Sequence, residues 1–194
     1  LDAGFGRLYA NTEAATAALG HQVHPAPMGN ITKQKADGSF KHRVIQDLRR
    51  NGVNGAVRLP ERQVLPRGVD HAKDMALLSE RERDRMAVLI LDFRDAFMSV
   101  PLHEDERPFN CAVSEAGFQL TRDPLDEHEP SKGTCIVWRV LGFGGKPNPR
   151  VYSRAATFPM RSGQALFPQS PRADCGVRVQ LYVDDPAVSL TGDV

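Results

Sequence analysis

The sequence predicts an α+β fold, in which short strands and amphipathic helices share the chain. Asp37-Gly38 lies between two extended segments and is a strong hairpin signal. The apolar run Met86–Leu91 predicts a buried strand, and the helical spacing of apolar residues over Val69–Arg85 predicts an amphipathic helix. With 194 residues, of which 41% are hydrophobic, the chain is long enough for one core or for two lobes that share one.

The N-terminal part predicts a short helix followed by a hairpin. Asn11–Leu19 is rich in alanine, begins with a capping residue and stops at a glycine, which favours a helix. His21–Asn30 contains two prolines and is interpreted as a linker. Ile31–Lys33 and Arg43–Leu48 are then expected to form two strands joined by the turn at 36–39.

The middle of the chain predicts a loop, a helix and a strand that ends in a carboxylate. Residues 51–66 are punctuated by glycine and proline and are expected to be a loop. The helix over Val69–Arg85 and the strand over Met86–Leu91 follow, and the strand leads directly into Asp92. Phe93–Met98 is too short for a full helix before the next proline.

The C-terminal half predicts further strands around one helix. The acidic segment 122–133, which has two prolines, is expected to be an exposed loop, and Pro149–Leu166 is expected to be helical only as far as Pro159. Asp184-Asp185 is expected to turn the chain between two strands. The expected strands are Phe109–Val113, Phe118–Leu120, Thr134–Val140, Val177–Val183 and Ala187–Leu190.

Charge is unevenly distributed although the formal net charge is only +1. Residues 31–67 carry nine Lys or Arg against three acids, a pattern that fits phosphate contact but is also typical of a solvated face. The three cysteines lack the paired spacing of a zinc site, so we expect them reduced. No apolar run is long enough to cross a bilayer and no leader opens the chain. We therefore expect a soluble intracellular protein, cytoplasmic or nuclear, that does not bind a membrane.

Two apolar strands deliver carboxylates, at Asp92 and at Asp184-Asp185. Carboxylates at the ends of adjacent strands repel one another, so such a site favours divalent cations. Mg²⁺ and Mn²⁺ suit oxygen ligands, and a pair of such ions activates an attacking oxygen and stabilises a leaving oxygen on phosphorus. The alternative is that Asp-Asp marks an ordinary hairpin turn.

Four groups of residues, in a fixed order along residues 31–190, resemble the motifs of reverse transcriptases. Leu181-Tyr182-Val183-Asp184-Asp185 resembles their Tyr-x-Asp-Asp motif, and residues 91–102, continued by 104–107, are similar to their first catalytic-aspartate motif. Residues 37–40 and 43–49, with Asn54, resemble the fingers hairpin of retroelement polymerases. Residues 141–144, with Pro149 and Tyr152, match the Phe-Gly…Pro…aromatic motif that lines the template and nucleotide. The joint match is much more specific than any single motif.

The resemblance implies a fingers–palm fragment of a retrotransposon reverse transcriptase, an RNA-directed DNA polymerase most like those of long-terminal-repeat or tyrosine-recombinase elements. The expected fold is an antiparallel palm sheet backed by helices, without a thumb. The expected parts are an N-terminal extension or linker at 1–30, fingers at 31–87, and a palm at 88–194 with a fingers insertion at about 119–149. The partners would be a dNTP and an RNA or DNA template with its primer.

The resemblance also assigns roles to the aspartates. Asp92, Asp184 and Asp185 would be catalytic and, with the backbone carbonyl of Phe93, would hold two Mg²⁺ or Mn²⁺ ions. Asp95 is interpreted as a helix cap and not as a further ligand.

The residues expected to contact the nucleotide lie in several motifs. Arg43 would clamp the triphosphate, with Lys35 or Lys41 assisting, because guanidinium matches phosphate bidentately. Phe97 would be the aromatic gate that excludes a ribose 2′-hydroxyl, and Gly144 would let the backbone approach the nucleotide. The full set is Arg43, Lys35, Phe93, Phe97, Phe143 and Gly144.

The sequence departs from the family pattern at several points. Pro186 follows the Asp-Asp pair, where an apolar residue is usual, and it removes a backbone donor from the returning strand. Ser153 stands where many relatives carry glutamine. The main alternative is therefore a catalytically inactive remnant or a nucleic-acid-binding module. An RNA-dependent RNA polymerase and a two-metal nuclease fit the residues less well, because neither explains Phe97.

Overall fold

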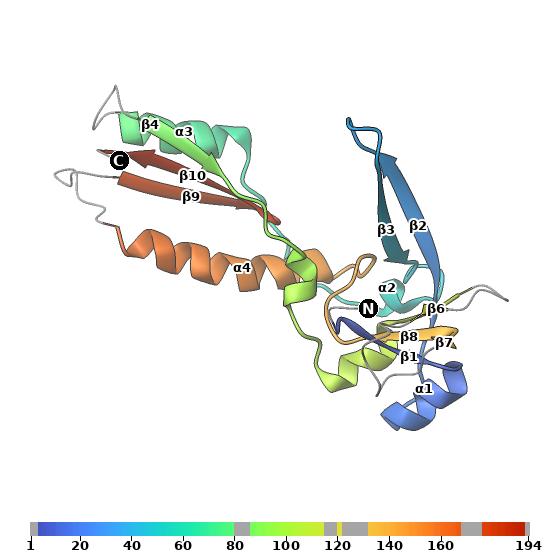
Figure 1. Ribbon diagram of the computed structural model, residues 1–194. Coiled ribbons are helices and arrows are strands. Elements are labelled where there is room, and N and C mark those ends of the chain that lie inside the picture. Colours follow the sequence, from blue (N-terminus) through green and yellow to red (C-terminus); the bar gives the residue numbers. More distant parts are fainter. Residues whose placement is uncertain (1–3, 80–85, 115–119, 122–131, 168–175, 193–194) are drawn as a thin grey trace. The chain divides into compact units, whose positions relative to one another are not determined.

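The computed structural model describes residues 4–79, 86–114, 120–121, 132–167 and 176–192 (Figure 1). The chain is a mixed α/β protein that divides into two compact units. The first unit comprises residues 1–59 and 97–148, and the second comprises residues 60–96 and 149–194. No helix in the described part of the chain has both the length and the apolar character that crossing a membrane requires.

The first unit is built on a five-stranded sheet with the strand order β1-β8-β5-β2-β3. Its pairings are antiparallel except for β2 and β5, which run parallel where Ala26 faces Ala112. A separate two-stranded ribbon pairs β6 (Leu120–Thr121) with β7 (Lys132–Gly133). The sheet strands are β1 (Gly6–Tyr9), β2 (Ala26–Gln34), β3 (Phe40–Gln46), β5 (Cys111–Val113) and β8 (Cys135–Trp138).

The helix expected after residue 11 is confirmed as α1 (Thr12–Leu19). Asn11 caps it by accepting a hydrogen bond from the Ala14 N–H at 2.8 Å, and Gly20 ends it in the left-handed conformation with φ 71°. The other helical elements of this part are short: α2 (Val53–Ala56), η1 (Ala96–Ser99) and η2 (Glu104–Phe109). The strand expected from Phe109 begins only at Cys111, because Phe109 ends η2 and the Asn110 N–H donates back to the Arg107 carbonyl at 3.0 Å.

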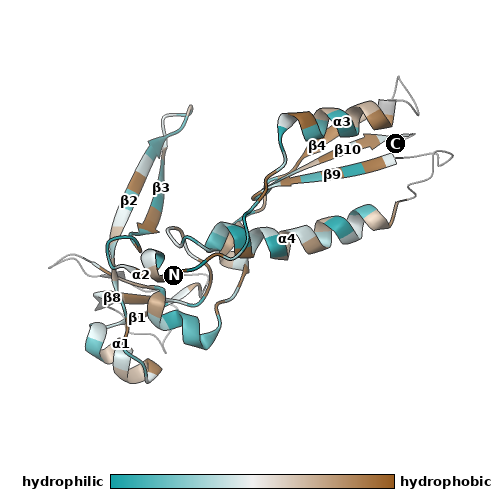
Figure 2. Cartoon of the chain, turned by 180° about the vertical axis from the view of Figure 1, so that it is seen from behind, coloured by the Kyte–Doolittle hydropathy of each residue, from teal (hydrophilic) through white to brown (hydrophobic). Residues whose placement is uncertain are grey.

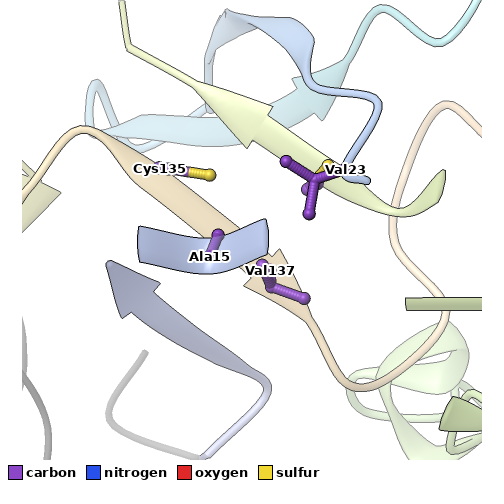
Figure 3. Packing of buried hydrophobic residues seen from close by; sticks show 5 residues of the cluster. Ala15, Val23, Cys135 and Val137 are labelled. Atoms are coloured by element: carbon purple, nitrogen blue, oxygen red, sulfur yellow. The ribbon is translucent and has the colours of Figure 1, made fainter. Parts of the chain in front are cut away.

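The core of the first unit lies on both faces of β8. On one face, Ala15 of α1 and Val23 pack against Cys111, Cys135 and Val137 (Figure 3). On the other face, β8 contributes to a second cluster, whose buried members are Leu8, Ala112 and Ile136. Cys111 and Cys135 are free and buried, as expected, and Cys175 lies outside the described residues.

Residues 1–30 therefore differ from the extension and linker that the sequence predicts. β1 pairs with β8, and β2 begins at Ala26, within the expected linker. The sequence did not predict this strand because Pro25 and Pro27 lie at its start, and proline disfavours a central strand. Pro27 is accommodated where the parallel pairing with β5 stops, and its carbonyl accepts a hydrogen bond from the Asp47 N–H at 3.0 Å.

The second unit contains an antiparallel three-stranded sheet, with the order β4-β10-β9, and two longer helices. Helix α3 contacts β9 and β10, and the side chain of Gln164 on α4 accepts a hydrogen bond from the backbone of Val179 on β9 at 3.0 Å. The second unit therefore combines an antiparallel sheet with helices, which is compatible with the predicted α+β class. The elements are α3 (Gly68–Ser79), β4 (Met86–Ile90), α4 (Asn148–Ala165), β9 (Gly176–Tyr182) and β10 (Asp185–Thr191).

Two expectations about these elements are wrong. All five residues of β4 are exposed, with Met86 at 36% and Ile90 at 73%, because β4 lies at the edge of the sheet and pairs with β10 alone among the described strands. Helix α4 continues through Pro159 instead of stopping there. Interior proline destabilises a helix but does not always end it, and Gln164, beyond the proline, is bound to β9.

Candidate functional site

The three candidate catalytic aspartates lie where β4 and β10 meet. The Leu91 N–H donates to the Pro186 carbonyl at 2.9 Å, and the Phe93 N–H donates to the Asp184 carbonyl at 3.3 Å. These bonds continue the β4–β10 register, so Asp92 lies across from Asp185. Directly opposite residues of an antiparallel pair project to the same face. The two carboxylates thus share one face of the sheet, and both residues are exposed.

The turn between β9 and β10 consists of Val183 and Asp184, because Tyr182 pairs with Asp185. The expectation that Asp184-Asp185 forms the turn is therefore corrected by one residue, and Asp185 is the first residue of β10. Val183 has φ 57°, a left-handed conformation that a β-branched residue rarely adopts. The tight turn places Asp184 next to Phe93 while Asp185 remains in the ladder.

Within the described ranges, no lysine, arginine or histidine forms an ion pair with Asp92, Asp184 or Asp185. Asp184 acts on Tyr152 of α4, whose pKa is raised by burial and further by the negative charge of Asp184. No three His, Cys, Asp or Glu side chains of the described residues gather as a group that would hold a metal ion. A cation held here would need oxygen ligands from water or substrate as well, as is usual for Mg²⁺.

Pro186 is accommodated within β10 without breaking the sheet. Its side chain is fully buried, it pairs with Leu181 of β9, and its carbonyl accepts from Leu91. The missing N–H removes one ladder bond toward Leu91 but leaves the register unchanged on both sides. The departure from the family pattern is therefore local to one hydrogen bond.

Ser153, the other departure near the site, has partners of its own. Its hydroxyl donates to the Pro149 carbonyl at 2.8 Å and accepts from the side chain of Gln63 at 2.6 Å. Glu61 binds Arg150 and Arg154 of the same helix, and these hydrogen bonds lower the pKa of the Glu61 carboxyl. The segment that precedes α3 is thus attached to α4.

In the first unit, the basic residues of the β2–β3 hairpin share one face. Lys33 lies directly opposite Lys41, and Arg43 lies two residues further along the same face, opposite Ile31. Neither strand contains an acidic residue, and Figure 2 shows the outer part of the hairpin in hydrophilic colours. Like charges directly opposite one another destabilise a strand pair, so this face favours an anionic partner. Lys35 lies in the turn that closes the hairpin.

Arg43 also belongs to a cluster with two aromatic rings. Its guanidinium carbon lies 5.9 Å from the ring centroid of Phe143, within cation–π range. Phe97 meets Phe143 edge to face, with 5.6 Å between the ring centroids. The Phe143 carbonyl accepts a hydrogen bond from the Gln46 N–H at 3.0 Å, which fixes this loop against β3.

Gly144 is required by the packing of the same loop. It has φ 117°, and an added Cβ would lie only 1.9 Å from the carbonyl oxygen of Gln46. Asn54 completes the contact, because its side chain donates to the Gly144 carbonyl at 2.8 Å and accepts from the Lys146 N–H at 2.8 Å. The close approach of backbone to β3 thus explains the glycine without a ligand.

The predicted site residues form two groups, one in each unit. Arg43, Phe97, Phe143 and Gly144 come together in the first unit, and Asp92, Phe93, Asp184 and Asp185 come together in the second. Asp95 directly precedes η1, has φ 51° and pairs with Arg94 at 3.5 Å.

Sequence reasoning gave no site role to Lys33 and did not predict that the charge of Asp184 acts on Tyr152. Only Lys33 had a sequence signal, because its pairing with Lys41 follows from the hairpin turn.

Comparison of the sequence with protein-family models and with curated proteins found no match. The chemistry of the two residue groups must therefore support any functional conclusion.

Proposed function

We propose that the chain carries the polymerase site of an RNA-directed DNA polymerase of a retroelement, which transfers dNTPs to a primer 3′-hydroxyl. The observation that carries the proposal is the pairing of Asp92 with Asp185 across β4 and β10, with Asp184 in the adjoining turn. Exposed carboxylates on one face of a sheet, with no ion pair to a basic side chain among the described residues, suit divalent cations.

The donor set fits Mg²⁺ or Mn²⁺, because every candidate ligand is an oxygen atom. Bound ions would activate the primer hydroxyl and stabilise the pyrophosphate leaving group. Asp92 and Asp185 would supply the first carboxylates, and Asp184 and the Phe93 carbonyl the remaining protein oxygens.

The group in the first unit supports the nucleotide-binding part of the proposal. Arg43 places an exposed guanidinium beside an aromatic ring, which suits a triphosphate and its attached sugar. Phe97, held against Phe143, would exclude the ribose 2′-hydroxyl. Lys41 is a better candidate for a second phosphate contact than Lys35, because it shares the face of Arg43.

The test is primer extension on RNA and DNA templates with Mg²⁺ and dNTPs. Asp92→Asn, Asp184→Asn and Asp185→Asn are each expected to reduce extension by roughly 100-fold or more, since each removes a charge that would hold an ion. Asp95→Asn is the matched control, because it removes an exposed carboxylate of the same segment that pairs with Arg94. Equal extension by the parent, Asp92→Asn and Asp185→Asn would contradict the proposed site.

A second candidate function is nucleic-acid binding without turnover, which the Lys33–Lys41–Arg43 face favours. Binding through this face should weaken with salt, and Lys41→Gln should lower the slope of log K against log salt by roughly one. Asp184→Asn should leave this binding unchanged. Binding without extension by the parent chain would establish this second function in place of the first.

A further inference from the structure

A cavity of about 280 Å³ lies in the first unit, and none of the predicted site residues lines it. Three arginines from three different parts of the chain line it: Arg7 of β1, Arg107 of η2 and Arg139, which follows β8. Each guanidinium remains charged at any physiological pH, so the three repel one another unless negative groups lie among them.

The β1–β8 register explains why two of these arginines meet. Arg7 pairs with Val137, so Arg7 and Arg139 project from the same face of the sheet as diagonal neighbours. The backbone of Arg139 is fixed on both sides, since its N–H donates to the Phe5 carbonyl at 2.9 Å and its carbonyl accepts from the Leu102 N–H at 2.8 Å. The backbones of Arg7 and Arg139 are therefore both held by sheet or loop hydrogen bonds.

The acidic residues of the cavity neutralise only part of this charge. Glu104 and Asp105 also line the cavity, and Glu104 pairs with the Arg107 guanidinium at 3.2 Å. The Arg107 side chain is 27% exposed, and its buried Nε has no hydrogen-bond acceptor within the described residues. Three guanidiniums and two carboxylates give these lining residues a net formal charge of +1.

Tyr9 adds a flat wall to the same cavity. The guanidinium carbon of Arg7 lies 5.6 Å from the Tyr9 ring centroid, within cation–π range, which orients the Arg7 fork. Orienting the fork before a ligand arrives reduces the entropy lost on binding.

We propose that this cavity binds a phosphate group, either free phosphate or the 5′-phosphate of a mononucleotide. Guanidinium forks match the oxygens of phosphate bidentately. The volume lies just below the range of pockets that enclose drug-sized ligands, so it suits a small anion and not a nucleic-acid chain. None of Asp92, Asp184 and Asp185 lines the cavity, and all three belong to the second unit.

The test is calorimetric titration of the chain with inorganic phosphate and, separately, with AMP. Arg139→Gln is expected to weaken phosphate binding by roughly 10-fold, because a charge-assisted hydrogen bond is lost. Glu104→Gln is expected to tighten it, because Arg107 is released from its carboxylate. Arg50→Gln, an exposed arginine of the same unit that does not line the cavity, should bind as the parent does.

Absence of phosphate binding by the parent would overturn the proposal, as would unchanged affinity in both Arg139→Gln and Glu104→Gln. If Arg139→Gln fails to fold, the direction of the Glu104→Gln effect decides, since loss of a purely structural ion pair would not tighten binding. Tighter binding of AMP than of phosphate would identify a nucleotide as the ligand, and equal affinities would identify free phosphate. Asp184→Asn should bind phosphate as the parent does, whatever its polymerase activity.

Discussion

Replacing Gly144 by alanine should destabilise the first unit strongly. The new Cβ would lie 1.9 Å from the Gln46 carbonyl oxygen and 3.0 Å from its carbon, both of them backbone atoms of β3 that cannot rotate away. The φ of 117° adds conformational strain for any residue with a side chain. Relief requires the loop to move off β3, which breaks the Phe143–Gln46 hydrogen bond. We expect a loss of about 3 kcal/mol in the free energy of unfolding, or roughly 10 °C in Tm.

The assay for this prediction uses the single tryptophan of the chain, Trp138, which lies in β8 of the first unit. Urea unfolding followed by tryptophan fluorescence therefore reports on the unit that contains Gly144. The matched control is Gly55→Ala, because a Cβ at Gly55 meets no atom within 4 Å. Midpoints for Gly144→Ala and Gly55→Ala that agree within error would refute the steric explanation.

Three further predictions concern the core, the thiols and the aromatic gate. Leu8→Ala should lower the free energy of unfolding by about 3 kcal/mol, because Leu8 is 1% exposed, whereas Val64→Ala, at an 84% exposed position, should change it little; urea titration compares the two. Burial raises the pKa of Cys111 to about 12 and that of Cys135 to about 11, so the stability that the protonated thiols contribute is complete below about pH 9 and is lost as the pH rises toward 12. Cys111→Ala should make this alkaline loss shallower, and equally steep curves for the parent and the variant would contradict it. Phe97→Ala should raise ribonucleotide incorporation by roughly 10-fold if Phe97 is the gate, measured as the ratio of rNTP to dNTP extension, and an unchanged ratio would count against that role.

The elements that the sequence predicts well are those with local causes. The β2–β3 hairpin follows from Asp37, which accepts hydrogen bonds from the Ser39 N–H and hydroxyl, with Gly38 at φ 81° beside it. Helix α1 follows from its cap at Asn11 and its left-handed Gly20. Both signals involve residues within a few positions of each other, so they can be recognised from the sequence without knowledge of the tertiary structure.

The expectations that were wrong depend on distant partners. Whether an apolar strand such as β4 is central or at an edge is decided by the order of strands in the sheet, which hydrophobicity does not encode. The membership of β1 in a sheet depends on β8, which is far away in the chain. Pro159 was expected to end the helix because proline has the lowest helix propensity. The sequence does not reveal that Gln164, beyond the proline, binds the backbone of β9.

In the candidate site, too, some arrangements could be predicted from the sequence and others depend on distant partners. Asp92 and Asp185 could be paired from their positions at strand ends, and the structure places them across from each other. The clustering of Arg43 with Phe143 and Phe97 followed only from the family resemblance, because the three residues are far apart in the sequence. The reason for Gly144 could not be predicted, since it lies in the backbone of β3.

The interleaving of the two units sets the order in which the chain can fold during synthesis. Leu8 of β1 pairs with Ile136 of β8, so its strand must wait until about 130 further residues have left the ribosome, roughly 6 to 26 s at ordinary translation rates. Meanwhile β2 and β3 can pair at once, since only a short turn separates them. The nascent chain would therefore present a formed basic hairpin before the two core clusters on β8 exist. Chaperone binding during that interval should centre on the apolar residues of β1.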